Sequence, residues 1–275
     1  MIKITVLIDN LPHPENQSLE AEHGLSFHIE TGNENILLDT GASDKYLHNA
    51  EKMDIDIAKV DYLILSHAHN DHTGGLAAFL QTNSKAKIYL SANINGSAYF
   101  STRRGGMRDI SIDYNLLHEY RDRFVFVSSD IQLTSSVRII SNIPMRYGIP
   151  LANRTLYAGR EPDTFNHEMA IAINHQGRST LLSSCTHLGL LNTLEVCKPA
   201  PSVFIGGMHL VDSDDNHQFE TENDYRSMSD IILSKYPALQ IYTGHCTGPN
   251  AQCALAHLLD GQFHTFHTGF EWCID

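Results

Sequence analysis

Three features are scarce in this sequence: long apolar runs, paired cysteines and positive charge. No apolar stretch in the 275 residues approaches the roughly 20 residues that a helix needs to cross a bilayer. The N-terminal segment MIKITVLIDN alternates like a strand and lacks the basic segment and long apolar segment of a signal peptide. We therefore expect no signal peptide and no membrane partner.

The five cysteines are odd in number and include no C-x-x-C pair. This pattern argues against a disulfide framework and against a structural zinc finger. Unpaired cysteines are typical of a reducing compartment, so we expect a cytoplasmic protein.

Acidic residues outnumber basic ones, 32 against 19, which gives a formal net charge of −13. An acidic surface repels nucleic acids and anionic membranes. This charge disfavours a nuclease that acts on long RNA, and we expect no nucleic-acid partner. Apolar residues make up 42% of the chain, which is enough for a sizeable core.

Short apolar or alternating runs predict strands, and longer amphipathic stretches predict helices. Val60–Ser66 is nearly continuous in apolar residues, as expected for a strand buried on both faces. Ser43 is the expected N-cap of a helix that runs to about Lys52. Further strands are predicted at Lys3–Ile8, Leu25–Glu30, Asn35–Asp39, Lys87–Ser91, Phe124–Val127, Ile131–Leu133, Val137–Ile140, Met169–Ile173, Ser179–Ser183, Val203–Ile205 and Gln240–Tyr242, and further helices at Leu76–Gln81, Leu188–Val196, Asp224–Lys235 and Ala251–Leu259.

The predicted strands fall into two groups with helices around them, and no low-complexity linker separates the halves. We therefore predict an α/β fold, a four-layer αββα sandwich in which two mixed β-sheets pack face to face with helices outside. The chain is expected to form a single domain over residues 1–275. Two less regular segments, near 93–122 and 145–163, are expected to be lids or insertions.

The most informative stretch is SHAHNDHTGG, which begins at Ser66. It places His67, His69, Asp71 and His72 within six positions. In an extended chain the first two histidines point the same way, and the last two residues lie where a helix begins, which favours a carboxylate. Imidazoles with one carboxylate suit zinc, iron or manganese, whereas calcium and magnesium prefer oxygen ligands. The stretch therefore predicts a metal site.

Three more histidines follow predicted strands closely. His187 comes after LLSSCT, His209 after VFIGGM and His245 after QIYTG. In layered α/β folds, sites assemble at the carboxyl ends of strands. Any one of these histidines alone would more often be structural, but together with the cluster at residues 67–72 they indicate metal ligands.

The motif H-x-H-x-D-H at residues 67–72 resembles the ligand motif of the metallo-β-lactamase superfamily. A closer resemblance is to its subfamily of dihydropterin–ribofuranosylaminobenzene 5'-phosphate synthase-like proteins. The motifs that carry this resemblance are AEHGLSFHIETG from Ala21, LLDTG from Leu37, SHAHNDHTGGL from Ser66, SCTHLGLLN from Ser184, GGMHL from Gly206 and GHCTG from Gly244. They span nearly the whole chain and imply the metallo-β-lactamase-like sandwich.

The resemblance also implies a ligand set and two divalent ions, with zinc expected ahead of iron or manganese. One ion would be bound by His67, His69 and His187, the second by Asp71, His72 and His245, and Asp39 would orient the site. The wider superfamily usually has a bridging aspartate between the third and last motifs, but Gly206 to His209 reads GGMH here. We expect His209 to be a ligand, a substrate contact or a proton shuttle, and the second ion to be held less securely.

Arg103, Arg104 and Arg108 are candidates for binding a substrate phosphate. They lie beside two glycines, and a guanidinium group matches phosphate oxygens with two hydrogen bonds. A solvated charged loop explains these arginines equally well.

His23 is a candidate substrate-binding residue, although a turn before a strand explains it nearly as well. Cys185 and Cys246 each lie within two residues of a predicted ligand, but cysteine is commonly a small buried apolar residue. His167 and Glu168 open a predicted strand and are expected to be structural.

Two metal ions about 3.5–4 Å apart can share a hydroxide, lower the pKa of bound water to around 7 and polarise a phosphoryl or carbonyl oxygen. No G-x-S-x-G motif suggests a serine nucleophile. We therefore predict a phosphodiesterase-like hydrolase that acts on a small anionic, phosphorylated substrate through a metal-bridging hydroxide. Asp71 would bind metal and the nucleophilic water, and His209 or His23 would protonate the leaving group.

Other functions stay open. The subfamily name implies a transferase or synthase in pterin-type cofactor biosynthesis, and a lactone or ester hydrolase and a non-catalytic metal sensor are further alternatives. An oxidative di-iron enzyme is disfavoured, because it would need more carboxylate ligands and a flavin-binding domain. The residues leave the oligomeric state open, with a homodimer as one option.

Overall fold

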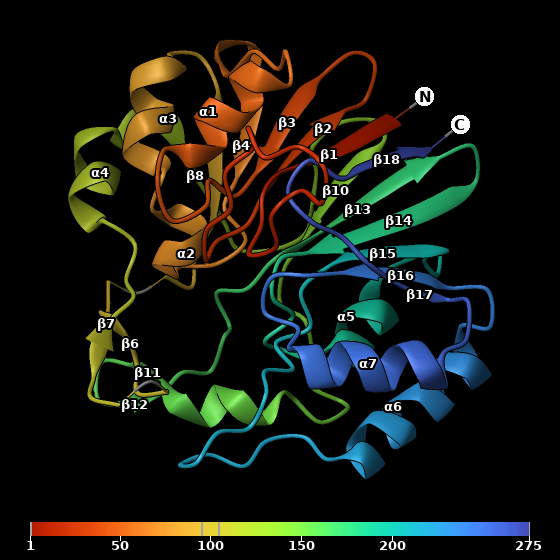
Figure 1. The fold of residues 1–275 in the computed structure, drawn as a ribbon. Coiled ribbons are helices and arrows are strands. Elements are labelled where there is room, and N and C mark those ends of the chain that lie inside the picture. The colour runs from red at the N-terminus through yellow and green to blue at the C-terminus, as the bar shows by residue number, and fades with distance from the viewer. Residues whose placement is uncertain (1, 95, 104, 275) are drawn as a thin grey trace. The chain divides into compact units, whose positions relative to one another are not determined.

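A computed structural model describes residues 2–94, 96–103 and 105–274 (Figure 1). By its internal contacts the chain divides into two compact units. The first comprises residues 1–99, 109–128 and 266–275, and the second comprises residues 100–108 and 129–265.

The first unit is built on a seven-stranded sheet in the order β18-β1-β2-β3-β4-β5-β8. Its strands are β1 (Ile2–Ile8), β2 (Ser26–Glu30), β3 (Asn35–Leu38), β4 (Tyr62–Ile64), β5 (Lys87–Ser91), β8 (Phe124–Val127) and β18 (Glu271–Ile274). The pairs from β18 to β3 are antiparallel, and those from β3 to β8 are parallel. The carboxyl ends of β3 and β4 therefore lie at the same edge of a mixed sheet.

Short helices of the first unit connect these strands: α1 (Lys45–Lys52), η1 (Ile57–Lys59), α2 (Asn70–Thr73), α3 (Leu76–Thr82), α4 (Tyr114–Glu119) and η2 (Arg121–Arg123). The predicted N-cap of α1 is wrong, since Asp44 and not Ser43 is the capping residue. Ser43 lies one position before the N-cap, where its hydroxyl donates to the Glu22 carboxylate at 2.6 Å and accepts the Lys45 backbone N–H at 3.3 Å.

The second unit is built on another seven-stranded mixed sheet in the order β17-β16-β15-β14-β13-β10-β9. Its strands are β9 (Ile131–Gln132), β10 (Val137–Ile140), β13 (Ala170–His175), β14 (Arg178–Ser183), β15 (Val203–Gly206), β16 (Gln240–Thr243) and β17 (Phe263–Thr265). Strands β14 to β17 are parallel, so their carboxyl ends lie at one edge. Helices α5 (Leu190–Val196), α6 (Glu222–Lys235) and α7 (Pro249–Leu258) follow three of these strands, and α6 packs against α7.

The segments expected to be irregular contain short regular elements. Strands β6 (Tyr99–Ser101), β7 (Arg108–Asp109), β11 (Leu156–Ala158) and β12 (Glu161–Pro162) form a four-stranded sheet, and η3 (Leu151–Thr155) precedes β11. Strands of two or three residues are too short to show a period in the sequence. Whether these segments act as lids stays a prediction.

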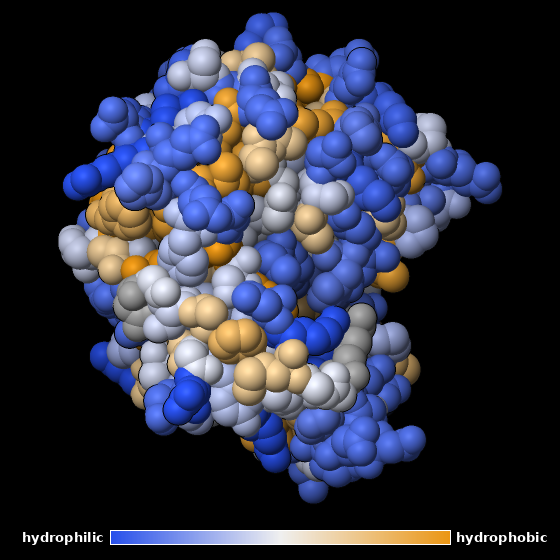
Figure 2. Space-filling view, turned by 90° about the vertical axis from the view of Figure 1, so that its left-hand side faces the viewer, coloured by the Kyte–Doolittle hydropathy of each residue, from blue (hydrophilic) through white to orange (hydrophobic). Residues whose placement is uncertain are grey.

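Every predicted strand is present, and the structure adds β6, β7, β11, β12, β17 and β18. β4 is shorter than the apolar run that predicted it, because Val60 ends η1 and the histidine-rich loop begins soon after Leu65, whose backbone N–H still donates to the Tyr89 carbonyl at 2.9 Å. Among the residues described, no helix has the length and apolar character to span a membrane. On the face seen in Figure 2, hydrophilic residues cover most of the surface and apolar residues appear in patches between them.

Candidate metal centre

The loop between β4 and α2 carries the histidine cluster of the first unit. His67 and His69 are buried, and their ring centroids lie 4.6 Å apart. His69 is the N-cap of α2, with an extended backbone, and Asp71 lies in the first turn of that helix as predicted. His67, His69 and Asp71 each offer a ligand atom, and these atoms all lie within 4.8 Å of one another. The loop therefore gathers two imidazoles and one carboxylate around a common point.

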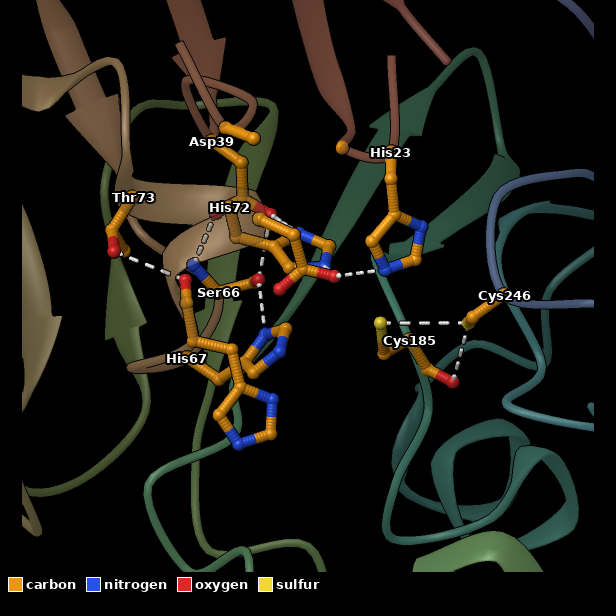
Figure 3. A network of polar contacts seen from close by, with 12 residues as sticks. His23, Asp39, Ser66, His67, His72, Thr73, Cys185 and Cys246 are labelled. Carbon is orange, nitrogen blue, oxygen red and sulfur yellow. Dashed lines mark hydrogen bonds and ion pairs between the residues drawn. The ribbon is translucent and has the colours of Figure 1, made fainter. Parts of the chain in front are cut away.

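Asp39 stands behind this loop, at the end of β3. Its carboxylate accepts hydrogen bonds from the Ser66 backbone N–H at 2.7 Å, from the Ser66 hydroxyl at 2.7 Å and from Nδ1 of His72 at 2.8 Å (Figure 3). The carboxylate is fully buried, and the backbone of Asp39 is left-handed, with a φ of 61°. A left-handed backbone is uncommon in a residue with a side chain, although aspartate adopts it more readily than most.

These contacts fix the tautomers of two histidines. The single Ser66 hydroxyl proton is donated to Asp39, so the hydroxyl oxygen accepts the proton of His67 Nδ1, which lies 2.8 Å away. His72 likewise donates its Nδ1 proton to Asp39. In both rings Nε2 then carries the lone pair, as a metal ligand requires.

His23 approaches the same loop from the segment before β2. Its Nε2 lies 3.5 Å from the Asp71 carboxylate, and its side chain is 46% exposed. The candidate substrate residue therefore stands beside a candidate ligand and in contact with solvent.

The second unit presents three histidines at the carboxyl edge of its parallel strands. His187 follows β14, His209 follows β15 and His245 follows β16, and all three are buried. The rings of His187 and His209 lie 4.1 Å apart. His209 and His245 have left-handed backbones, with φ values of 48° and 51°. The expectation that the three follow neighbouring strand ends is confirmed, and their roles as ligands stay predictions.

His187 is held by two residues that the sequence did not single out as functional. The Asn153 amide donates to the His187 carbonyl at 2.7 Å, so its oxygen, 3.0 Å from Nδ1, accepts the ring proton. Glu168 is buried and accepts the backbone N–H groups of His187 and Leu188, both at 2.8 Å. His187 thus has the same tautomer as His67 and His72, with the lone pair on Nε2.

The candidate arginines are placed as follows. Arg108 is exposed on β7, Arg103 is partly buried, and Arg104 lies outside the described residues. Their role in substrate binding stays a prediction.

The donor set of each unit fits a metal ion of the zinc, iron or manganese class. Three of the predicted ligands have Nδ1 occupied by a neighbouring oxygen and Nε2 as the ligand atom, which is the usual arrangement around a metal-bound histidine. The ligand sets that combine residues of the two units stay predictions.

Comparisons with known proteins agree with this chemistry. Residues 19–138 match the profile of the Metallo-beta-lactamase superfamily. A 7,8-dihydropterin-6-methyl-4-(beta-D-ribofuranosyl)-aminobenzene-5'-phosphate synthase of Methanocaldococcus jannaschii is 26% identical in an alignment of 275 positions that covers 92% of this chain and 90% of the relative.

Solved structures show the same fold. A metal-dependent hydrolase of the β-lactamase superfamily superposes with a TM-score of 0.81 at 22% identity and covers 100% of this chain and 99% of its own. A diphosphatase of the PhnP family superposes with a TM-score of 0.54 at 14% identity and covers 100% and 98%. The predicted α/β fold with mixed sheets and helices is therefore confirmed.

Proposed function

We propose that this chain, whose residues 19–138 match the Metallo-beta-lactamase superfamily profile, is a metal-dependent hydrolase of small anionic, phosphorylated substrates. The observation that carries the proposal is the gathering of ligand atoms from His67, His69 and Asp71 within 4.8 Å of one another. The Ser66 and Asp39 contacts behind them support it, because they set His67 in the tautomer that binds metal.

We assign two divalent ions, zinc by expectation, to the predicted ligands. His67, His69 and His187 would hold one ion, and Asp71, His72 and His245 would hold the other. When bound, such ions supply an activated water at neutral pH and polarise the oxygen of the bond to be broken. Asp39 acts on this site as a positioning residue, through His72 and Ser66.

The proton chemistry is assigned to Asp71 and His23. The Asp71 side chain is 20% exposed, so one of its oxygens can accept a hydrogen bond from the attacking water. His23 is more exposed and stands 3.5 Å from Asp71, where its imidazolium form can donate a proton to the leaving group. We therefore favour His23 over His209 as the general acid.

A phosphorylated substrate is favoured by the chemistry of the relatives. The relative from Methanocaldococcus jannaschii is named as a synthase of a phosphate-bearing product, and one structural neighbour is a diphosphatase. Arg103 and Arg108 are the candidate phosphate contacts in this chain. A synthase activity on a related phosphate is the second candidate, since the relative spans 92% of the chain. A cytoplasmic location stays a prediction.

The first test combines metal content with a phosphoester assay. Protein purified without chelator is analysed for bound metals and assayed on bis(p-nitrophenyl) phosphate and p-nitrophenyl phosphate. We expect at least two equivalents of metal and measurable turnover. Metal with no turnover on any ester would refute the hydrolase and favour the synthase or a sensor.

Two variants sharpen this test. His67→Ala removes a predicted ligand, and we expect it to lose metal and at least about 100-fold in kcat/KM. His118→Ala is the matched control, because His118 is an exposed histidine on α4 of the same unit. Equal loss in both variants, or none in His67→Ala, would contradict the assignment.

A further inference from the structure

A second group of side chains that could hold a metal ion lies within the second unit and includes two cysteines. Cys185 follows β14, His209 follows β15 and Cys246 follows β16, so the three come from neighbouring strand ends. All three are buried, and their ligand atoms lie within 4.8 Å of one another. Figure 3 shows the two cysteine side chains pointing toward each other.

The distance between the sulfurs matches a shared metal ion better than a disulfide. The Cys246 thiol donates a hydrogen bond to Cys185 Sγ across 3.4 Å, whereas a disulfide joins two sulfurs at about 2.05 Å. A tetrahedral ion with metal–sulfur bonds of about 2.3 Å separates two ligand sulfurs by about 3.8 Å. A shift of a few tenths of an ångström would therefore complete the geometry.

The backbone around Cys246 Sγ both donates a hydrogen bond to this sulfur and packs tightly against it. The backbone N–H of His209 donates to Cys246 Sγ at 3.2 Å, which stabilises negative charge on that sulfur. A Cβ at Gly207 would lie 2.5 Å from Cys246 Sγ and 2.5 Å from the Ser184 carbonyl oxygen. Glycine at this position therefore leaves the space that the sulfur occupies.

We propose that Cys185, Cys246 and His209 bind a thiophilic ion of the zinc class. Thiolates select soft and borderline ions, in contrast to the imidazole and carboxylate set of the first unit. Binding would release the thiol protons to solvent, and water would complete the shell. The site gives His209 a role at the position where the superfamily resemblance led us to expect a bridging aspartate, and it does not depend on the proposed hydrolase activity.

X-ray absorption at the zinc edge of the zinc-loaded full chain tests the site directly. We expect a sulfur shell at about 2.3 Å beside the nitrogen and oxygen shell at about 2.0–2.1 Å. A wild-type spectrum with nitrogen and oxygen alone would overturn the proposal. An intact mass two hydrogens below that of the reduced chain would overturn it in favour of a Cys185–Cys246 disulfide.

Cysteine variants test which sulfur atoms bind the zinc ion. The Cys185→Ser, Cys246→Ser double variant should lose the sulfur shell and about one equivalent of zinc. The Cys253→Ser, Cys273→Ser double variant is the matched control, because both of these cysteines are exposed, and it should keep both. A sulfur shell that survives in the first variant would refute the assignment.

Should the first variant fail to fold, the cobalt-loaded wild type decides the question. Thiolate ligation gives it an intense near-ultraviolet charge-transfer band, and the absence of this band would overturn the proposal. Neither readout requires turnover, so a failure of the proposed function would leave both results interpretable.

Discussion

Asp39→Asn is the most searching test of the histidine network in the first unit. The Asp39 carboxylate is fully buried and accepts three hydrogen bonds, two of them on Oδ2, from the Ser66 hydroxyl and His72 Nδ1. In the variant an amide N–H replaces Oδ2 and faces two groups that also donate. The Ser66 hydroxyl must then turn to accept, so it donates to His67 Nδ1, and His72 must move its proton away from Nδ1.

Both changes move a proton onto Nε2, which is the atom assigned to the metal. Loss of one supporting group typically lowers metal affinity 10- to 100-fold, and two ligands are affected here, so we expect about 100-fold weaker binding. Hydrogen bonds to a buried charge contribute roughly 1.5–3 kcal/mol each, so the metal-free variant should also lose about 2–3 kcal/mol of unfolding free energy.

The assay is a metal titration against a chromophoric chelator, with urea unfolding of the metal-free protein and nitrogen NMR of the histidine rings. Asp44→Asn is the control, because it makes the same chemical change at an exposed aspartate five residues away. Metal affinity within about threefold of the wild type in Asp39→Asn, with His67 and His72 still protonated on Nδ1, would refute the reasoning.

Two further predictions concern stability. Burial and the nearby Lys3 lower the pKa of His28 to about 4 from 6.5, so the folded chain keeps this ring neutral where the unfolded chain protonates it. The unfolding free energy should therefore be unaffected by His28 above pH 6.5 and should fall by at most about 3 kcal/mol as the pH drops toward 4. His28→Leu should flatten this dependence of the unfolding free energy on pH, measured by urea unfolding between those pH values. An unchanged dependence would contradict the assignment. Gly206→Ala would place a Cβ 1.8 Å from the Ser183 carbonyl oxygen and should cost about 3 kcal/mol or more, whereas Gly148→Ala, in open space, should change the unfolding free energy by less than about 0.5 kcal/mol. Equal thermal midpoints for the two glycine variants would disprove this steric argument.

Strands were the feature that the sequence predicted best, because each is marked by an apolar run. The apolar runs located every strand of four or more residues except β18. Because the strands that precede His187, His209 and His245 pair in parallel, these histidines lie at the same edge of the sheet. β18 was missed because EWCI is short and mixed in character, although it pairs with β1 at the start of the chain. Pairing between the two ends of a chain leaves no local signal.

The residues that hydrogen-bond to Nδ1 of the predicted ligands were harder to predict, because such a contact depends on the folded structure. Asp39 was expected from the superfamily resemblance, but the residues that support His67 and His187 were not. Ser66 directly precedes His67, and a hydroxyl beside a ligand is a signal that could have been used. Asn153 acts on His187 from 34 positions away, within a segment expected to be irregular, and nothing local marks it.

In each unit an oxygen atom accepts the Nδ1 proton of a predicted ligand, but different residues supply that oxygen. The Ser66 hydroxyl accepts the His67 ring proton and donates its own proton to the Asp39 carboxylate, which makes the hydroxyl oxygen a stronger acceptor. The His187 ring proton is instead accepted by a neutral amide oxygen, that of Asn153. A ligand supported by a carboxylate is more basic than one supported by an amide. His67 should therefore be the more basic of these two ligands of one ion, and replacing Asn153 with aspartate should raise the basicity of His187 toward that of His67. This ordering follows from the supporting atoms, which the spacing of the ligand motif does not reveal.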